Sequence, residues 1–262
     1  MDMQLEGKRA FISGSTTGIG YAIAEALAQE QACVIINGRT KQRVQQAVEA
    51  LRKRGGDVHG VTADLGTPRG IEQLLSCFPD LDILINNLGI FEPKPFEQIS
   101  DEDWLRFFEV NVLSGVRLSR HYLPRMKERG WGRVIFISSE SGLQIPSEMI
   151  HYGTTKTAQL AVARGLAETL AGTNVTVNSV LPGPTASEGA LEFMDRLAAS
   201  NQKSRQQFEK EFFENVRPSS ILKRFERPEE IGSVVAFLCS PLASAITGAA
   251  IRADGGVVRS IG

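Results

Sequence analysis

The sequence predicts one α/β domain in which helices cover both faces of a parallel sheet. Two observations lead to this prediction. Short, continuously apolar segments, typical of strands buried on both faces, alternate with longer segments whose apolar residues recur at helical spacing. No linker, repeat or low-complexity segment interrupts them, so we expect a single domain over 1–262 with right-handed crossovers. With 262 residues, 42% of them apolar, the chain can bury a substantial core.

The elements follow from these patterns in chain order. Strands are expected at 9–13, 33–37, 58–61, 82–86, 133–138, 175–181 and 249–252. Helices are expected at 18–30, 41–54, 68–77, 101–129, 152–171 and 228–239. Ser100 and Asp103 form a capping box that opens the fourth helix. Pro182-Gly183-Pro184 is expected to break the sixth strand, and the polar stretch 185–220, with scattered phenylalanines, follows it.

Composition excludes several classes of protein. The net charge is −1 with both signs spread along the chain, so no basic stripe points to nucleic acid. Cys33, Cys77 and Cys239 are odd in number and far apart, and lack metal-ligand spacing, so we expect neither a disulfide framework nor a metal site. The N-terminus has no signal-peptide pattern, and no segment approaches the roughly 20 apolar residues of a membrane span. We expect a cytoplasmic protein with no membrane partner.

The segment SGSTTGIG, residues 13–20, follows the first strand and opens the first helix. Glycines here cost backbone entropy, which a pyrophosphate-binding turn would justify. Gly14 would allow the turn, Gly18 would leave room for the phosphates, and Gly20 would let the helix pack closely. Backbone N–H groups at the helix N-terminus would then face the anion. A tight turn without a ligand is the alternative.

A set of polar residues lies further along the chain. Tyr152 and Lys156 are spaced i, i+4, which places both on one helical face. Ser139 ends an apolar strand, and Asn111 is a polar residue inside an apolar part of the long preceding helix. A Tyr–Lys pair on a helix usually consists of exposed residues without a specific role. The order and spacing of these four residues after the glycine-rich turn in the sequence nevertheless favour a catalytic site.

With these motifs the sequence resembles the short-chain dehydrogenase/reductase family along nearly its whole length. The matching segments are SGSTTGIG, ADL (63–65), NNLG (86–89), Asn111, ISS (137–139), YGTTK (152–156), PGPT (182–185) and ITGAAIRADGG (246–256). The resemblance implies a doubly wound Rossmann domain whose parallel sheet has seven strands in the order 3-2-1-4-5-6-7. It also implies hydride transfer between a nicotinamide cofactor and a carbonyl or secondary alcohol, with Tyr152 as general acid and base.

The resemblance assigns further roles. Lys156 would hold the nicotinamide ribose and, with the oxidised nicotinamide, lower the pKa of Tyr152. Ser139 would bind the substrate oxygen, and Asn111 would hold a water linked to Lys156. The implied cofactor-binding residues are Gly14, Ser15, Thr17, Gly18, Ile19 and Gly20 at the phosphates, Asp64 and Leu65 at the adenine, Asn87 and Gly89 at its ribose, and Pro182, Gly183 and Thr185 at the nicotinamide amide. Ser13 and Leu88 depart from the usual Thr and Ala, so packing beneath the cofactor must differ.

The end of the second strand bears on the choice of cofactor. Gly38 stands where an acid would hold the ribose hydroxyls of NAD, and Arg39 follows it. A cation without that acid favours the 2′-phosphate of NADP(H), with NAD(H) as the alternative. Asn37 and Thr40 would add neutral hydrogen bonds. A solvent-facing Arg39 is the other interpretation.

These motifs do not identify the substrate. We expect 185–220 to be a lid, in which apolar side chains either cover an apolar substrate or pack helices: Phe193, Met194, Leu197, Phe208, Phe212 and Phe213. Near the site, polar side chains either contact substrate or face water: Glu140, Gln144, Glu148 and His151. A 3-oxoacyl-carrier-protein reductase would dock its carrier through Arg125, Lys127 and Arg129, but the turn 172–174 lacks a basic residue that such enzymes often show. A non-catalytic nucleotide sensor is a second alternative, which would have no need of the Ser–Tyr–Lys–Asn set.

The resemblance implies a homotetramer, in which helices 101–129 and 152–171 pair across one two-fold axis and the last strand pairs across another. Small apolar residues widen the apolar surface of the second helix: Ala158, Ala161, Val162, Gly165 and Ala167. Close helix pairing across a two-fold axis would cover them. Val257, Val258 and Ile261 near the C-terminus also require cover. A dimer is the alternative.

Overall fold

A parallel sheet forms the centre of the molecule. The computed structural model of the chain describes residues 2–200 and 204–261, and the side chains of 193 and 196–200 lie outside the described part. The strands are β1 (Arg9–Ile12), β2 (Cys33–Gly38), β3 (Val58–Thr62), β4 (Ile83–Asn86), β5 (Gly132–Ile137), β6 (Val175–Pro182) and β7 (Ala250–Ala253). The seven strands lie in the order β3-β2-β1-β4-β5-β6-β7, which confirms the implied order. Because β1 pairs with both β2 and β4, the winding reverses there, and a binding crevice is expected at the carboxyl ends of these strands.

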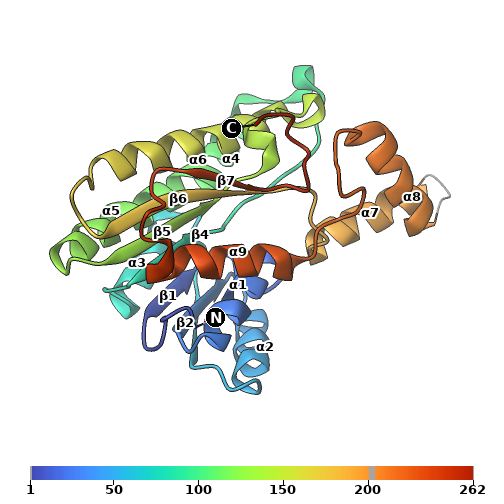
Figure 1. The fold of residues 1–262 in the computed structure, drawn as a ribbon. Coiled ribbons are helices and arrows are strands. Elements are labelled where there is room, and N and C mark those ends of the chain that lie inside the picture. The colour runs from blue at the N-terminus through green and yellow to red at the C-terminus, as the bar shows by residue number, and fades with distance from the viewer. Residues whose placement is uncertain (1, 201–203, 262) are drawn as a thin grey trace.

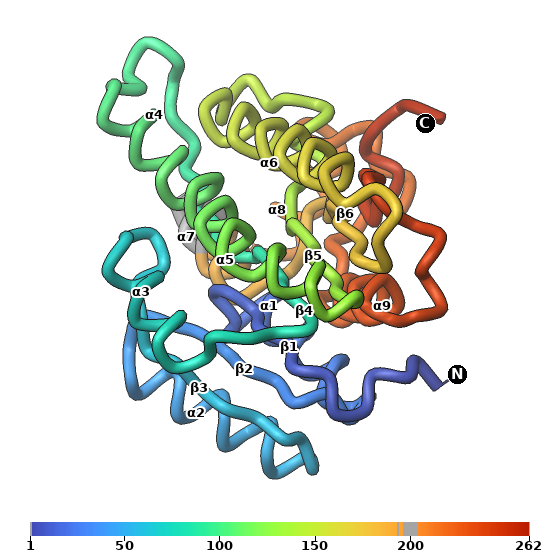
Figure 2. The backbone as a smooth tube through the Cα atoms, turned by 90° about the vertical axis from the view of Figure 1, so that its left-hand side faces the viewer, coloured from blue at the N-terminus to red at the C-terminus, as the bar shows by residue number. Residues whose placement is uncertain are grey.

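Helices cover both faces of the sheet (Figure 1). One layer consists of α1 (Gly18–Gln29), α2 (Lys41–Arg52) and α9 (Pro228–Cys239). The other consists of α3 (Pro68–Cys77), α4 (Asp101–Phe108), α5 (Ser114–Glu128) and α6 (Ile150–Glu168), and Figure 2 shows α4, α5 and α6 together on one side. Successive residues of a strand serve opposite layers: Ala10 and Ile12 join the α1/α9 core, and Phe11 joins the α5/α6 core. This alternation explains why the strands are apolar throughout.

Two elements differ from the sequence-based expectation. The helix expected over 101–129 begins at its predicted capping box, but a π-helical turn, Glu109–Leu113, separates α4 from α5. Asn111 lies in that turn. Pro182 is the last residue of β6 and pairs with Ala253 of β7, so the strand runs one residue further than expected and then ends within Pro182-Gly183-Pro184, as predicted. The proline is tolerated because β5 has already ended at Ile137, opposite Val180, so no neighbour on that side needs a proline N–H.

The segment after β6 leaves the sheet and returns to it. It contains α7 (Glu188–Ser200), α8 (Arg205–Glu211) and a second π-helical turn, Phe212–Val216, none of which the sequence predicted. These helices stand beside the sheet layers in Figure 1. An isolated parallel bridge between Thr185 and Glu226 joins the two ends of the excursion. The excursion is therefore anchored at the carboxyl end of β6.

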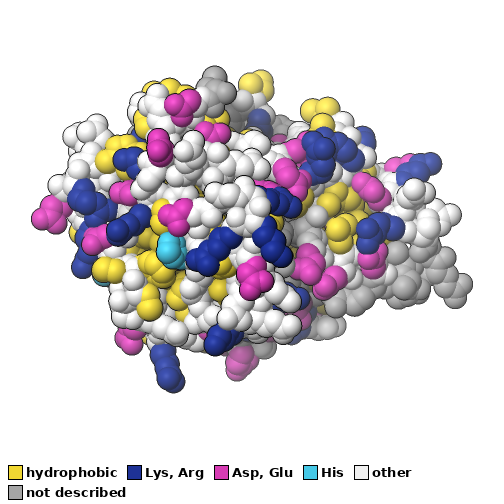
Figure 3. Space-filling model, turned by 90° about the horizontal axis from the view of Figure 1, so that it is seen from below, with side chains coloured by type: hydrophobic (Ala, Val, Ile, Leu, Met, Phe, Trp, Pro, Cys, Tyr) yellow, Lys and Arg dark blue, Asp and Glu magenta, His cyan; other side chains and the backbone are white. Residues whose placement is uncertain are grey.

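One face of the molecule carries mixed charges. On the face seen in Figure 3, basic and acidic side chains are interspersed, in keeping with the net charge of −1. Among the described helices, none combines the length and apolar character needed to cross a bilayer. The cysteines Cys33, Cys77 and Cys239 are free thiols.

Candidate active site

The glycine-rich turn is held rigidly between β1 and α1. Gly14 and Gly18 have φ of +60° and +61°, which favours glycine at both positions. A Cβ on Gly20 would lie 2.6 Å from the carbonyl oxygen of Gly14, so only glycine lets α1 approach the turn. The N-cap residue Thr17 makes no side-chain cap, and the first turn of α1 contains no acidic residue. This uncapped, positively polarised helix end fits a phosphate group.

Polar side chains from neighbouring strands support the turn. The Ser15 Oγ donates to Ile12 O at 2.7 Å, and the Ser13 Oγ accepts from the backbone N–H of Asn87 and of Leu88, each at 2.9 Å. The Asn87 amide donates to the carbonyls of Ser13 and Gly14, both at 2.9 Å. Asn87 thus braces the turn, while Gly89 is exposed beside it. Ser13, the departure from threonine, keeps the hydroxyl that this bracing requires.

The end of β2 has no room for an acidic side chain. A Cβ on Gly38 would lie 2.6 Å from the Thr16 methyl group and 3.1 Å from a methyl group of Val44. Arg39 follows as an exposed residue. The buried Asn37 side chain accepts from Gly14 N and donates to Val61 O and Ala63 O. Its amide is committed to the fold, so the expectation that Asn37 meets a 2′-phosphate is wrong.

The residues assigned to the adenine lie at the next strand end. Asp64 is exposed after β3, and its carboxylate accepts from Gly66 N at 3.1 Å. Leu65 is buried in the α5/α6 core. At the first turn of α1, Thr17 is exposed and Ile19 is partly buried. These residues line the same carboxyl edge of the sheet as the glycine-rich turn.

Ser139 and Tyr152 line one cavity of about 400 Å³. Gly183, Pro184 and Thr185 line it from β6, and residues of α7, α8 and the second π turn line its other side. Phe91 packs edge-on against the Tyr152 ring, with centroids 6.4 Å apart. The structure therefore brings the serine, the tyrosine and the 182–185 loop to one place.

Lys156 lies behind the tyrosine. Its Nζ donates to Ile137 O at 2.9 Å and to Gln159 Oε1 at 3.2 Å, and lies 5.6 Å from the centroid of the Tyr152 ring. Gln159 in turn donates to the backbone carbonyl of Asn111 at 2.6 Å. The Asn111 side chain ties Ile90 to α6 through Thr155. A buried glutamine thus connects Lys156 to Asn111, a link that the sequence analysis assigned to water.

Burial governs the protonation of this pair. It raises the pKa of the Tyr152 hydroxyl, and the lowering effects of a hydrogen bond with Ser139 and of Arg217 are smaller. Burial lowers the pKa of Lys156 to about 7. The expectation of a lowered tyrosine pKa therefore does not hold for the protein alone, because burial of the Tyr152 hydroxyl outweighs the lowering effects of Ser139 and Arg217. An additional cation is needed to favour tyrosinate.

A buried carboxyl group that the sequence analysis missed supports the 182–185 loop. Glu226 Oε2 accepts from Gly183 N at 3.0 Å and lies 3.4 Å from the Thr185 Oγ1. The buried Oε1 has no hydrogen-bond partner among the described residues. Burial raises the pKa of Glu226 to about 7. Glu226 lies in the charge-rich run 223–230, which resembles an exposed segment, so no sequence signal marked it.

Arg217, which the sequence analysis missed, joins the excursion to Glu140 and Glu148, which that analysis named as residues that contact substrate or face water. Arg217 donates from Nε to Glu140 Oε1 at 2.8 Å and from Nη1 to Glu148 Oε1 at 3.2 Å. The other oxygen of Glu140 accepts from the Ser139 Oγ at 2.7 Å and from the Ser141 hydroxyl. Glu140 and Arg217 are 4% and 8% exposed, so Glu140 does not face water. Glu148 is partly buried.

The remaining residues of uncertain role fall into two groups. Met194, Phe208 and Phe212 line the cavity, whereas the buried Phe213 packs against Phe212 and Phe225. The side chains of Phe193 and Leu197 lie outside the described residues. Gln144 is exposed, and His151 is buried against Phe107 and Trp104 with ring centroids 4.1 and 6.1 Å away.

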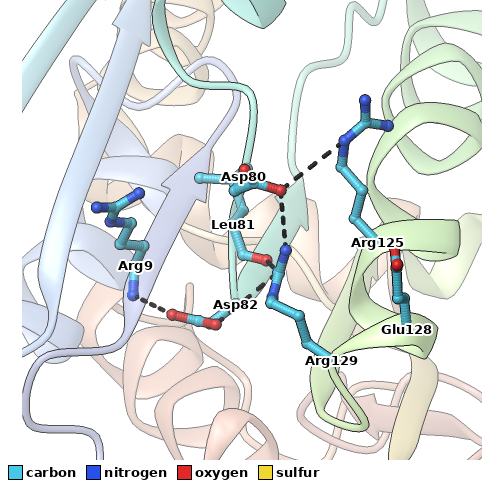
Figure 4. A pocket seen from close by; sticks show the side chains of 7 residues that line it. All are labelled: Arg9, Asp80, Leu81, Asp82, Arg125, Glu128 and Arg129. Carbon is cyan, nitrogen blue, oxygen red and sulfur yellow. Dashed lines mark hydrogen bonds and ion pairs between the residues drawn. The ribbon is translucent and has the colours of Figure 1, made fainter.

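The basic residues considered for carrier docking lie at the other end of the sheet. Figure 4 shows Arg125 and Arg129 around a surface hollow of about 450 Å³, directed at Asp80. Arg129 donates to Asp80 at 2.9 Å, and Arg125 lies 3.8 Å from the same carboxylate. The neighbouring Asp82 precedes β4, at the amino ends of the strands, whereas Ser139 and Tyr152 lie at the carboxyl ends. These arginines do not face the candidate site.

Three potential metal ligands that are far apart in the sequence meet at the edge of the sheet. Cys33, Asp57 and His59 have ligand atoms within 4.8 Å of one another. Asp57 and His59 are exposed, and the His59 Nε2 lies 3.4 Å from a carboxylate oxygen of Asp57. Spacing along the chain could not find this group, because β2 and β3 bring it together only in the folded sheet.

The fold, with the glycine-rich turn and the Ser139–Tyr152 cavity at the carboxyl ends of its strands, is typical of nucleotide-binding α/β oxidoreductases. Comparison with known proteins agrees. A family model described as Enoyl-(Acyl carrier protein) reductase matches residues 14–258. The "Uncharacterized oxidoreductase YvaG" of Bacillus subtilis is 50% identical, with 100% of both chains covered. The "3-oxoacyl-[acyl-carrier-protein] reductase FabG" of Aquifex aeolicus is 35% identical, over 98% of this chain and 100% of the relative. The chain belongs to the short-chain dehydrogenase/reductase family and is an oxidoreductase.

A solved structure is also similar over its full length. The L-sorbose reductase from Gluconobacter frateurii, complexed with NADPH and L-sorbose, has a TM-score of 0.94 and 32% identity, with 100% of each chain covered.

Proposed function

We propose that this protein transfers hydride between NADP(H) and a carbonyl or secondary alcohol, with Tyr152 as the general acid in reduction and the base in oxidation. One observation carries the proposal: Ser139, Tyr152 and the Gly183–Thr185 loop line a single cavity, and Ser187, just after that loop, packs against Gly18 of the glycine-rich turn. Bound NADPH would supply the hydride that the carbonyl carbon receives. The protein would supply orientation and the proton.

The roles proposed for the chain's own groups follow from their positions. Tyr152 would donate its hydroxyl proton to the developing alkoxide, and Ser139 would donate a hydrogen bond to the same oxygen. Lys156, positioned by hydrogen bonds to Ile137 O and Gln159, would hold the nicotinamide ribose and, when charged, favour the tyrosinate form of Tyr152. The backbone of the 183–185 loop, fixed by Glu226, would hold the nicotinamide amide. The helix N-terminus at Thr17 would bind the pyrophosphate.

Several features support NADP(H) over NAD(H). An acid at position 38 would clash with Thr16, so the group that selects for NAD by holding both ribose hydroxyls is absent for a steric reason. Arg39, next to it, is an exposed cation that can pair with a 2′-phosphate. The L-sorbose reductase of similar fold is complexed with NADPH, which supports the same choice.

We propose that the substrate is a free small molecule. The chain would form a single domain in which residues 185–220 serve as a lid over the substrate. The cavity lies between the catalytic residues and that segment, and its volume of about 400 Å³ suits a small molecule. The arginines that would dock an acidic carrier are paired with Asp80 at the opposite end of the sheet. This arrangement favours a free carbonyl compound over a carrier-bound one.

The proposal is tested by screening carbonyl compounds with NADPH and secondary alcohols with NADP⁺, following absorbance of the reduced nicotinamide. We expect turnover with at least one class of carbonyl. Tight NADPH binding with no turnover across the screen would instead support a non-catalytic nucleotide sensor and contradict the proposal.

A further inference from the structure

The carboxylate of Glu140 occupies an unusual place in the cavity. It directly follows the catalytic serine, lies buried in the cavity wall, and accepts hydrogen bonds on both oxygens. Oε1 accepts from Arg217, and Oε2 accepts from the hydroxyls of Ser139 and Ser141. The only proton of the Ser139 hydroxyl is thus directed at Glu140 in the protein without substrate.

That proton is needed elsewhere during reduction. A hydroxyl has a single O–H donor, so Ser139 cannot donate to Glu140 and to a substrate oxygen at once. When Ser139 turns to the carbonyl oxygen of the substrate, Glu140 Oε2 loses one of its donors inside a buried site. A buried carboxylate that loses a donor costs free energy unless another donor replaces it.

We infer that Glu140 accepts a hydrogen bond from a substrate hydroxyl on the carbon next to the carbonyl, so that the preferred substrates are neutral α-hydroxy ketones, reduced to vicinal diols. This inference rests on the proposed function. Only a donor beside the reacting carbonyl is near enough to replace the Ser139 proton, because Ser139 and Glu140 are adjacent. The L-sorbose of the similar reductase complex is itself an α-hydroxy ketone.

Charge and shape define the rest of the substrate. Arg217 pairs with two carboxylates, Glu140 and Glu148, so these three side chains together carry a net negative charge, which disfavours an anionic substrate. On the lid side the cavity wall includes Met194, Phe208 and Phe212, which suit the carbon skeleton of the substrate. In the reaction, hydride adds to the carbonyl carbon, the Tyr152 proton adds to its oxygen, and NADPH becomes NADP⁺.

The test compares two ketones that differ only at the group beside the carbonyl. The pair is 3-hydroxy-2-butanone and 3-methyl-2-butanone, in which a methyl group replaces the hydroxyl. For the wild type with NADPH we expect kcat/KM to favour the hydroxy ketone by about tenfold to a hundredfold, as a charge-assisted hydrogen bond gives. The ratio is unaffected by the fraction of protein that is correctly folded.

Two variants assign the preference to Glu140. Glu140→Gln removes the charge and is expected to lower the ratio at least fivefold. Because an unpaired Arg217 is costly, the double variant Glu140→Leu/Arg217→Met removes the ion pair as a whole and is expected to bring the ratio to one or below. Glu97→Gln, the same change on an exposed turn, is the control and should keep the wild-type ratio.

The outcomes separate the inference from the proposal beneath it. Equal kcat/KM for the two ketones in the wild type, or a preference that survives in both Glu140 variants, overturns the inference while carbonyl reduction stands. An absence of NADPH oxidation with every carbonyl of the wider screen overturns the proposed function itself.

Discussion

At the scale of single residues, the site depends on polar groups placed where burial changes their protonation. Lys156 and Glu226 are almost fully buried, and burial shifts the pKa of each toward neutrality from opposite directions. Burial also raises the pKa of Tyr152, which moves it away from neutrality. Such shifts are common where a site must hold or move a proton near neutral pH.

The choice of cofactor is predicted to depend on Arg39. Arg39→Ala should weaken NADPH binding about tenfold or more and leave NADH binding unchanged, because one charge-assisted contact to the 2′-phosphate is lost. Dissociation constants for both cofactors, measured by quenching of protein fluorescence, check this. Lys53→Ala, which removes the same charge at the far end of α2, is the control. An unaltered NADPH constant in Arg39→Ala would refute the assignment.

Glu226 should make stability depend on pH. Its carboxyl holds its proton to about pH 7 in the folded protein but ionises near its ordinary value of 4.5 when unfolded. The folded state therefore binds more protons between these values, so stability is full below pH 4.5 and is lost as the pH rises to about 7. Glu226→Gln cannot ionise and so avoids this loss. We expect its free energy of unfolding, relative to that of wild type, to be roughly 2 to 3 kcal/mol higher at pH 8 than at pH 5.

Urea denaturation of both proteins at the two pH values measures this gain. Glu49→Gln, an exposed glutamate on α2, is the control and should show no such difference. If the stability difference between wild type and Glu226→Gln is the same at pH 5 and pH 8, the carboxyl does not titrate as described.

At the scale of elements, the sequence predicted those features that depend only on residues close together in the chain. The apolar strands and the capping box at Ser100 are encoded within a few residues, and each lies where expected. The break at Pro182-Gly183-Pro184 was also predicted, but the inclusion of Pro182 as the last residue of β6 was not, because it depends on where β5 ends. The helices of the 185–220 excursion were missed for the same reason: their apolar side chains face a cavity formed by other segments.

The close approach of α1 to the glycine-rich turn gives a direct prediction. Gly20→Ala should destabilise the protein by about 1–3 kcal/mol and weaken NADPH binding, because the added Cβ would lie 2.6 Å from Gly14 O. Urea denaturation and a cofactor titration check both effects. Gly189→Ala on α7, an exposed position where an added Cβ meets nothing within 4 Å, is the control. If Gly20→Ala is as stable as wild type, helix packing does not require the glycine.

At the scale of the whole molecule, contacts between distant segments form the part of the site that sequence reasoning missed. Arg217 and Glu140 are 77 positions apart. Glu140 directly follows the ISS segment and was named from the sequence, but Arg217 stands in no recognisable motif, so their pairing was not predicted. Their pairing exists only because the excursion after β6 returns over the carboxyl end of β5. Tyr152 and Lys156, by contrast, were found because their relation is fixed by one turn of one helix.

The outer face of α6 supports the proposal of a homotetramer. Ala161 and Gly165 are exposed on it, and Leu105 of the neighbouring α4 is 70% exposed. Pairing of these helices across a two-fold axis would cover them. We expect light scattering at micromolar protein to give four times the chain mass of 28.6 kDa, and Ala161→Arg to give a smaller species. A wild-type mass of one chain would refute the assembly, and one of two chains would limit it to a single interface.

The proton donated by Tyr152 is the central claim, and Tyr152→Phe tests it most directly. The substitution removes only the hydroxyl, so kcat on a substrate identified in the screen should fall by about 10²-fold or more. The dissociation constant for NADPH, measured on the same preparation, should remain within a few-fold of wild type, which excludes misfolding as the cause. A variant that keeps most of the wild-type kcat would contradict the proposed mechanism.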